Sequence, residues 1–289
     1  MAAAWLSQYE QSQRIIDLDG DITDLGERTL EERLAEARAY NSEMADPGAS
    51  LAANERLPLT DLPDGDDDYY SLLDADEEGL MARLKIPAID LDLPIYHGTS
   101  EWVLQHGIGH LEGTAFPVGG ESTHSVLTGH RGLATAELFT RLDEVAVDDT
   151  FTIEVFGEVL TYQVIETEVV EPEDTQSLNI RPDRDLLTLV TCTPLGINSH
   201  RILVTAERVI PTPQKDLDAA GRAPEIPTFP WWLVIASGVV LALTAYVWFS
   251  GRPPRTVPSG AATARDAAAS PEAAALGSPR REARRSGGQ

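Results

Sequence analysis

Alternating hydrophobic and polar positions predict a mainly β domain in the middle of this chain. From residue 81 onward, short runs with a period of two are separated by turns that contain glycine or proline, as expected of β-strands. About eight such strands, together with short helices, favour a closed or nearly closed β-barrel. One of these helices is predicted at residues 134–142. The strands are predicted at residues 82–86, 93–96, 125–128, 150–156, 159–170, 186–191 and 201–209.

The N-terminal part of the chain has the pattern of helices instead. Residues 27–44 are predicted to form an amphipathic helix, with Thr29 and Glu32 as a capping box at its start. A shorter helix is predicted at residues 7–16. The positions expected on the apolar face of the longer helix are Leu30, Leu34, Ala37 and Tyr40.

A long loop, residues 46–79, connects this helical part to the barrel. It contains prolines, glycines and an acidic run at residues 64–68, so no regular element is expected in it. Long loops in compact domains are often lids or binding segments, whereas acidic loops are also common as solvated linkers. The sequence leaves both readings open.

An uncharged stretch, Phe229 to Phe249, is predicted to span a membrane. It is long enough to cross a hydrocarbon layer of about 30 Å as a helix, and tryptophans lie at both of its ends. The tail that follows is rich in arginine, so the positive-inside rule places it in the cytoplasm and the large N-terminal part outside. Residues 1–6 are too short for an export signal, and we therefore expect an N-terminal signal or membrane segment to be missing from this sequence.

These patterns divide the chain into five predicted parts. They are a helical extension with the candidate lid loop at 1–80, the barrel at 81–211, a proline-containing linker at 212–228, the membrane helix at 229–249, and a basic, disordered tail at 250–289.

The net charge of the chain argues against nucleic acid as a partner. There are 47 acidic and 22 basic side chains among 289 residues, which gives a formal charge of -25 and an isoelectric point near 4.4. Such a chain repels phosphate groups.

The single cysteine, Cys192, is the first candidate for chemistry. It lies at the end of an apolar run, residues 186–191, just before a turn, and it has no partner for an internal disulfide. A lone thiol in this position is either a buried filler or a nucleophile, because free cysteine is among the most buried residue types.

Two further residues could work with the cysteine. His130 follows a predicted strand and lies between Gly129 and Arg131-Gly132, and Arg201 opens another strand. A nucleophilic thiol, a proton carrier and a permanent cation are the groups that acyl transfer through a thioester needs. Each residue considered alone is more often structural than catalytic. For the set of three residues, spacing alone leaves the catalytic and structural interpretations about equal.

Three segments resemble the signature segments of sortases, the cysteine transpeptidases of Gram-positive surfaces. They are Thr128-Gly129-His130-Arg131-Gly132, Thr188-Leu189-Val190-Thr191-Cys192-Thr193-Pro194 and His200-Arg201-Ile202-Leu203-Val204, in the same order as in that family. The resemblance extends over residues 82–211. It implies a sortase-like barrel with Cys192 as nucleophile, His130 as proton carrier, Arg201 as the oxyanion or substrate contact, and Thr191 and Thr193 as supporting residues.

The helical extension and the C-terminal apolar segment resemble class C, the pilus-building sortases, here of actinobacterial type. The class implies cleavage of a Leu-Pro-X-Thr-Gly-like sorting signal and transfer to a pilin lysine, or alternatively to a cell-wall peptide amine. Its lid carries an Asp-Pro-aromatic motif, but in this chain Gly48 follows Asp46-Pro47. We therefore predict a substitute in which a ring covers Cys192 and a carboxylate lies near Arg201. The candidate lid residues are Asp46, Pro47, Asp68, Tyr69 and Tyr70.

Other readings fit the sequence less well. His97, His106, His110 and His124 have no zinc-site spacing, and we expect neither a metal nor another cofactor. A wall-anchored surface protein would need a sorting pentapeptide before the apolar stretch, which residues 223–228 do not supply. L,D-Transpeptidases have a Ser-His-Gly-Cys type of motif, and papain-like proteases place the cysteine before the histidine.

Overall fold

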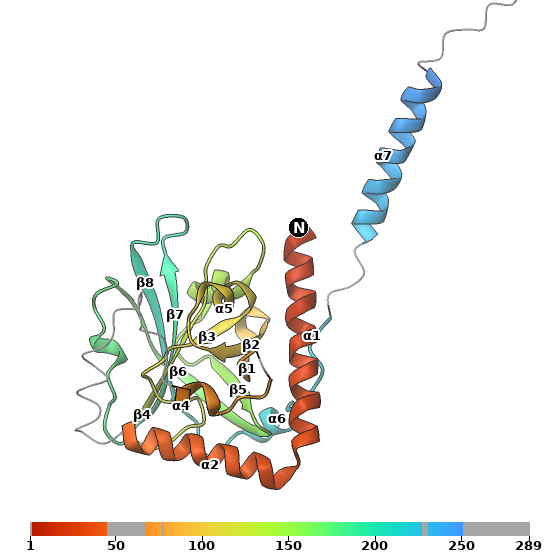
Figure 1. Ribbon diagram of the computed structural model, residues 1–289. Coiled ribbons are helices and arrows are strands. Elements are labelled where there is room, and N and C mark those ends of the chain that lie inside the picture. Colours follow the sequence, from red (N-terminus) through yellow and green to blue (C-terminus); the bar gives the residue numbers. More distant parts are fainter. Residues whose placement is uncertain (1, 45–66, 77, 227–230, 251–289) are drawn as a thin grey trace, which may run out of the picture. The chain divides into compact units, whose positions relative to one another are not determined.

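A closed barrel of eight strands forms the centre of the computed structural model, which describes residues 2–44, 67–76, 78–226 and 231–250 (Figure 1). The order of the strands around the barrel is β1-β2-β3-β4-β7-β8-β6-β5. Their bounds are β1 Leu80–Ile86, β2 Leu91–His97, β3 Ile108–His110, β4 Thr123–Thr128, β5 Thr150–Val155, β6 Glu158–Val170, β7 Asp185–Thr193 and β8 His200–Arg208.

The barrel predicted from the sequence is confirmed. Each predicted strand is present, with ends that differ by one or two residues. The strand that the pattern missed, β3, has three residues, Ile108, Gly109 and His110, which is too short for alternation to be recognised. β3 pairs with β2 in parallel and with β4 antiparallel, and β4 in turn pairs with β7 in parallel.

Several short helices connect the strands. They are α4 Asp67–Ser71, η1 Pro87–Ile89, α5 Glu101–His106, η2 Leu138–Glu144, η3 Gln176–Leu178 and α6 Gln214–Leu217. The helix predicted at 134–142 is the 3-10 helix η2, so it begins four residues later than expected. Leu138, Phe139 and Leu142 are buried, which explains why the apolar pattern was visible although its start was wrong.

Two long helices, α1 Ala2–Leu25 and α2 Glu27–Met44, pack against the barrel (Figure 1). The bounds of α2 match the prediction, and Leu34 and Ala37 are buried on its inner face. The predicted capping box is wrong, because the helix begins two residues before Thr29 and the amide of Thr29 donates to the Gly26 carbonyl.

α1 is much longer than the helix predicted at 7–16. The sequence pattern did not show its full length, because polar and acidic residues occupy most of the helix and its apolar face is narrow. Ile15 and Leu18 are its buried apolar side chains.

On α2, the buried Asn41 exchanges two hydrogen bonds with the backbone of Phe116, which fixes the helix to the barrel.

The barrel interior takes one face of each strand. On β7, Leu187 and Leu189 belong to the main core, together with Leu127 of β4 and Val204 of β8. Val190 belongs to a separate cluster with Leu111, Val126, Leu178 and Leu203. Because side chains alternate between the two faces of a strand, the even-numbered residues of β7 lie on the outside of the barrel.

The buried Arg83 joins several elements of the fold. Its guanidinium donates to both carboxylate oxygens of Asp92, at 2.7 and 2.6 Å, and to the carbonyl of Arg222 at 2.9 Å. It is 1 % exposed and also lies 3.4 Å from Glu154 and 3.8 Å from Asp19 of α1. One side chain therefore connects α1, three strands and the segment after β8.

We expect Arg83→Met to lower the free energy of unfolding by about 3 kcal/mol. Removing one partner of a buried ion pair leaves the other charges uncompensated, and the partial exposure of Asp92 and Asp19 places the effect at the lower end of the usual range. Urea unfolding measures the change. Arg38→Met, which removes an exposed pair with Glu158, serves as the control and should change it by less than about 1 kcal/mol. Equal effects of the two substitutions would contradict this role of Arg83.

Residues up to 226 belong to one compact unit, and α7 Trp231–Ser250 belongs to another. Among the residues that the structure describes, no helix has both the length and the hydropathy needed to cross a membrane. The predicted membrane span at 229–249 therefore stays a prediction. The basic tail at 251–289 and most of the candidate lid loop, residues 45–66, lie outside the described residues.

Candidate active site

Cys192 and Arg201 are direct neighbours across two strands. They form a cross-strand pair of the antiparallel strands β7 and β8, so their side chains lie on the same face. In the same register Val190 pairs with Leu203, which belongs to the cluster outside the barrel. Cys192 and Arg201 therefore face outward at the end of β7.

His130 completes a row with these two residues. β4 and β7 are parallel, and the last pair in their register is Thr128 with Val190. Two residues further along, this register brings His130 level with Cys192. The hydrogen bonds between residues 129 and 191 and between residues 131 and 193 continue this offset beyond the end of β4, so the backbones of the three residues lie next to one another at this end of the sheet.

Two side-chain hydrogen bonds on either side of this level fix the register. The Thr191 hydroxyl donates to the Gly129 carbonyl at 2.7 Å, one residue before His130 and Cys192. Arg131 Nη1 donates to the Thr193 hydroxyl at 3.0 Å, one residue after them. Thr191 and Thr193, predicted as supporting residues, thus hold the histidine loop against the cysteine strand.

Glycine is required beside His130. A side chain at Gly129 would lie 2.6 Å from the ring of Phe139 and 2.7 Å from Ile108, which no Cβ tolerates. The amide of Gly129 donates to Val190, and the amide of Phe139 donates to the carbonyl of His130. The loop therefore holds the backbone on both sides of the imidazole, whose side chain remains 28 % exposed.

The thiol of Cys192 is half-buried and lies outside the core clusters. Within the described part of the chain, its sulfur makes no hydrogen bond. A buried filler would instead be enclosed by apolar side chains. The position of Cys192 thus favours the nucleophile over the filler, since a nucleophile must be reached by substrate.

Arg201 carries free donors toward this face. Its Nη1 donates to the carbonyls of Asn198 and His200, at 3.0 and 3.1 Å, which ties the side chain to the β7–β8 turn. Its Nε and Nη2 atoms have no hydrogen-bond partner among the described residues. These two nitrogens are therefore available to a substrate carbonyl or an oxyanion.

Two residues of the site were not predicted. Arg131 is 8 % exposed in its side chain and bonds to Thr193, to the Thr140 carbonyl and to Asp143. Glu101, at the start of α5, lies 3.7 Å from His130 Nε2. Arg131 could have been noticed because it stands within the Thr128–Gly132 segment, whereas no sequence pattern connects Glu101 with His130.

Comparison with known proteins agrees with this geometry. Residues 84–209 match the family model of the Sortase domain. Sortase D of Bacillus subtilis (strain 168) is 30% identical over 129 residues, which are 44% of this chain and 62% of that protein. The chain thus spans less than two thirds of that relative.

Solved structures match a larger part of the chain. Streptococcus pneumoniae sortase C is 42% identical with a TM-score of 0.62, covering 68% of this chain and 96% of that one. The chain belongs to the sortase family. Sortase C-1 of Actinomyces oris is 46% identical with a TM-score of 0.56, covering 62% of this chain and 98% of that one. Both structures are class C sortases, which confirms the class predicted from the sequence.

In this sortase, the predicted lid role of Tyr69 is wrong. Tyr69 is 0 % exposed, and its ring stacks on Phe116 and on His110. Its hydroxyl lies 2.9 Å from His110 Nδ1 and accepts from the Gly98 amide. His110 pairs with Leu127 of β4, and Leu127 pairs with Leu189 of β7, so Tyr69 bonds to a level of the sheet that lies three residues before Cys192. Tyr69 is a core residue because its large ring fills the space beside β2 and β3.

The other lid candidates have different outcomes. Tyr70 is 43% exposed and contacts the rings of Tyr69 and His97, so it lies with Tyr69 rather than over the thiol. Asp68 is in α4, but its side chain is not among those described. Asp46 and Pro47 lie outside the described residues, and their role in a lid stays a prediction.

Three of the four clustered histidines are buried in the barrel. Burial lowers the pKa of His110 to about 3 and that of His124 to about 4, and burial also lowers the pKa of His97. His124 lies between the Asn179 carbonyl and the Thr188 hydroxyl, an arrangement that suits a neutral imidazole. Across the described residues, no group of three metal-ligating side chains occurs. These histidines are structural residues of the sortase fold.

Proposed function

We propose that this sortase is a cysteine transpeptidase that cleaves a Leu-Pro-X-Thr-Gly-like sorting signal and transfers the new acyl group to a lysine amine of a pilin. The observation that supports it most is the row of His130, Cys192 and Arg201 across the end of β4, β7 and β8. The two hydrogen bonds that flank this row, from Thr191 and Arg131, hold it in register.

In the first half of the reaction, His130 accepts the proton of the Cys192 thiol, and the thiolate attacks the carbonyl carbon of the signal's threonine. The free nitrogens of Arg201 stabilise the oxyanion that forms. The imidazolium of His130 then gives its proton to the glycine nitrogen as the Thr-Gly bond breaks. The products are a thioester on Cys192 and a released fragment whose first residue is the glycine.

In the second half, a neutral amine attacks the thioester and passes a proton to His130. The thiolate of Cys192 leaves and regains that proton, so the enzyme returns to its starting state. The net reaction exchanges one amide bond for another, and no external oxidant, reductant or cofactor takes part. The Streptococcus pneumoniae sortase C structure is described in terms of pilin substrate specificity, which supports a pilin lysine as the acceptor.

An acyl-transfer assay tests this function with the full chain. A fluorescent peptide with a Leu-Pro-X-Thr-Gly motif is mixed with a lysine-containing pilin peptide or with a cell-wall peptide amine, and the products are identified by mass spectrometry. We expect a product in which the peptide up to threonine is joined to the lysine side chain. Joining to the wall peptide instead would assign the chain to wall anchoring, and failure to cleave any such signal would contradict the proposal.

We expect Arg201→Ala to lower kcat/KM for acyl-enzyme formation by about 10²- to 10³-fold, because an oxyanion donor is lost from a fixed position. Arg201→Lys should recover only part of this activity, since a lysine offers no second donor in the same plane. Arg181→Ala, which removes an exposed ion pair with Glu166, is the control and should keep full activity. If Arg201→Ala were as active as the control Arg181→Ala, Arg201 would have no role in the reaction.

A further inference from the structure

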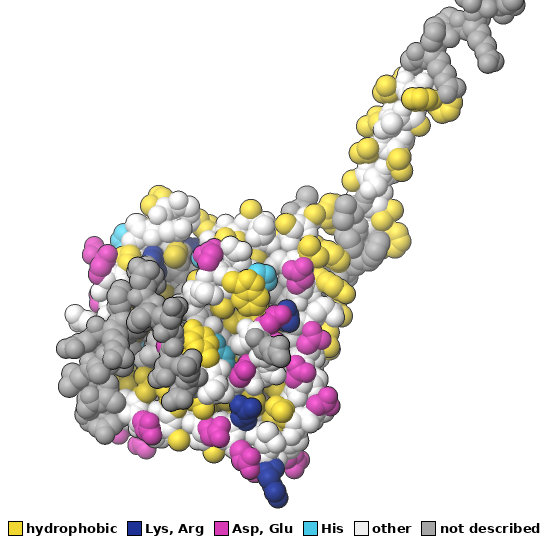
Figure 2. Space-filling model, viewed as in Figure 1, with side chains coloured by type: hydrophobic (Ala, Val, Ile, Leu, Met, Phe, Trp, Pro, Cys, Tyr) yellow, Lys and Arg dark blue, Asp and Glu magenta, His cyan; other side chains and the backbone are white. Residues whose placement is uncertain are grey.

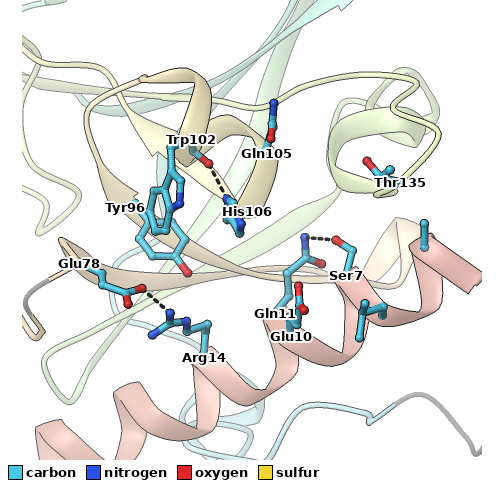
Figure 3. A pocket seen from close by; sticks show the side chains of 12 residues that line it. Ser7, Glu10, Gln11, Arg14, Glu78, Tyr96, Trp102, Gln105, His106 and Thr135 are labelled. Carbon is cyan, nitrogen blue, oxygen red and sulfur yellow. Dashed lines mark hydrogen bonds and ion pairs between the residues drawn. The ribbon is translucent and has the colours of Figure 1, made fainter.

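A cavity of about 720 Å³ lies between α1 and α5 (Figure 3). We call it the α1–α5 groove. One wall comes from β2 and α5 with Tyr96, Trp102 and His106, and the other comes from the first half of α1 (Figure 3). The α1 residues that line it are Ala3, Leu6, Ser7, Glu10, Gln11 and Arg14.

The groove is suited to a cation. The ring of Trp102 is 44% exposed, is stacked on His106 at 4.6 Å, and is held edge-on by Tyr96. A fixed and accessible indole face attracts ammonium and guanidinium groups. Across the groove, Glu10 makes no ion pair with any described residue, whereas Arg14 is already paired with Glu78. The carboxylate of Glu10 is therefore the unneutralised charge on this wall.

Further acceptors line the same groove. Gln11 is 6% exposed, and its amide nitrogen donates weakly to Ser7 at 3.4 Å, which leaves its carbonyl oxygen to the groove. His106 Nδ1 donates to the Trp102 carbonyl at 2.7 Å, so in the neutral form of this ring Nε2 is an acceptor. The groove therefore offers acceptors to a ligand that brings hydrogen-bond donors.

Two of the residues that line the groove, Gln105 and Thr135, link it to the surroundings of His130. Thr135 is in the loop that carries His130. Glu101 begins the same helix as Trp102, and its carboxylate lies 3.7 Å from His130 Nε2 while also accepting from Gln105. Gln105 lies one helical turn after Glu101 and bonds to it, so the groove is linked to His130 through these two side chains.

We propose that the α1–α5 groove is the acceptor site, which holds the lysine-bearing segment of the second substrate before transfer. This inference rests on the proposed transpeptidase function. The lysine ammonium is attracted by Glu10 and Glu101 and passes over the face of Trp102. It gives one proton to solvent, and the resulting amine attacks the thioester on Cys192, passing a second proton to His130. Acyl transfer to the lysine therefore releases one proton in total.

Steady-state kinetics with the full chain test the acceptor site. The sorting peptide is held constant, and the concentration of a lysine-containing peptide is varied. We expect Trp102→Leu to raise the KM for the lysine peptide about tenfold and Glu10→Gln to raise it two- to fivefold. Neither variant should change the rate of acyl-enzyme formation. The effect of Glu10→Gln should shrink at high salt, because exposed charges are screened.

Hydroxylamine separates this inference from the proposed function. It is a small neutral nucleophile that needs no groove, so its reaction with the thioester should be equal in the wild type and in both variants. Asp17→Asn, on the exposed side of α1 outside the groove, is the matched control and should leave the KM for the lysine peptide unchanged.

Two results would overturn these claims separately. If the wild type forms no hydroxamate, the transpeptidase function fails. If hydroxamate forms at equal rates but Trp102→Leu and Glu10→Gln keep the wild-type KM for the lysine peptide, the groove is not the acceptor site. Because Glu10 is exposed, its substitution tests the site even if Trp102→Leu weakens the packing on Tyr96.

Discussion

Cys192→Ala is expected to lower the rate of sorting-signal cleavage by at least about 10⁴-fold, the loss seen when a covalent nucleophile is removed from an acyl-transfer enzyme. No other cysteine exists in the chain, and Arg201, the cross-strand partner of Cys192, cannot form the thioester. Initial rates of release of the glycine-ended fragment, followed by chromatography, measure the loss.

The structure of the Cys192→Ala variant should be preserved. The thiol is half-buried and belongs to no core cluster, so its loss leaves no enclosed cavity and should change the free energy of unfolding by less than about 1 kcal/mol. Cys192→Ser is the conservative control, and it should also be nearly inactive because a hydroxyl is a much weaker nucleophile than a thiolate. A folded alanine variant that still cleaves the signal would contradict the assignment of Cys192.

His130→Gln is expected to have the second-largest effect, a loss of about 10³- to 10⁴-fold in both halves of the reaction. In the proposed mechanism, the imidazole removes the thiol proton, protonates the leaving glycine nitrogen and later accepts the proton of the attacking amine. Glutamine has a similar shape but cannot carry a proton. The loop should stay in place, since it is held by Gly129, Phe139 and Arg131 rather than by the imidazole.

Single-turnover kinetics check the role of His130, with acyl-enzyme formation and its reaction with amine measured separately. Both rates should fall in His130→Gln. His200→Gln is the matched control, because that imidazole lies close to the site but contacts Ser199. If only one of the two rates fell in His130→Gln, another group would have to carry the proton in the other step.

The strands of this fold could be predicted well because their apolar positions either alternate or form a continuous buried run. In β7, residues 186–191 are buried on both faces, and the apolar run marks the strand clearly. β3 could not be predicted, since three residues give no period. α1 was predicted too short because Asp17, Asp19 and Asp21 interrupt its apolar stripe, and one of these acids serves the buried Arg83.

The residues of the candidate site could be selected from the sequence, whereas their arrangement in space could not. Cys192, His130 and Arg201 stand out by type and by neighbours along the chain, whereas their alignment depends on the parallel register of β4 and β7. That register is held by Thr191 and Arg131 through contacts between residues 62 positions apart. The lid prediction for Tyr69 failed for a related reason, since residue type alone does not distinguish a covering ring from a core ring.

The acidic surface of the molecule favours the approach of a substrate that carries lysine. Asp and Glu side chains are spread over the visible face of the molecule, with few Lys or Arg among them (Figure 2). A net charge of -25 attracts substrates that carry lysine over distances of about a Debye length, close to 8 Å at physiological salt. In the proposed acceptor site, Glu10 adds local attraction within the groove, and Glu101 adds it beside His130.

The most direct test of the central claim is the intact mass of the enzyme after mixing with a Leu-Pro-X-Thr-Gly peptide in the absence of amine. We predict an adduct that equals the peptide up to threonine, located on Cys192 by fragmentation, released by hydroxylamine, and absent from Cys192→Ala. Release of the glycine-ended fragment from the wild type with no adduct at any time, or an equal adduct on Cys192→Ala, would contradict a thioester at Cys192.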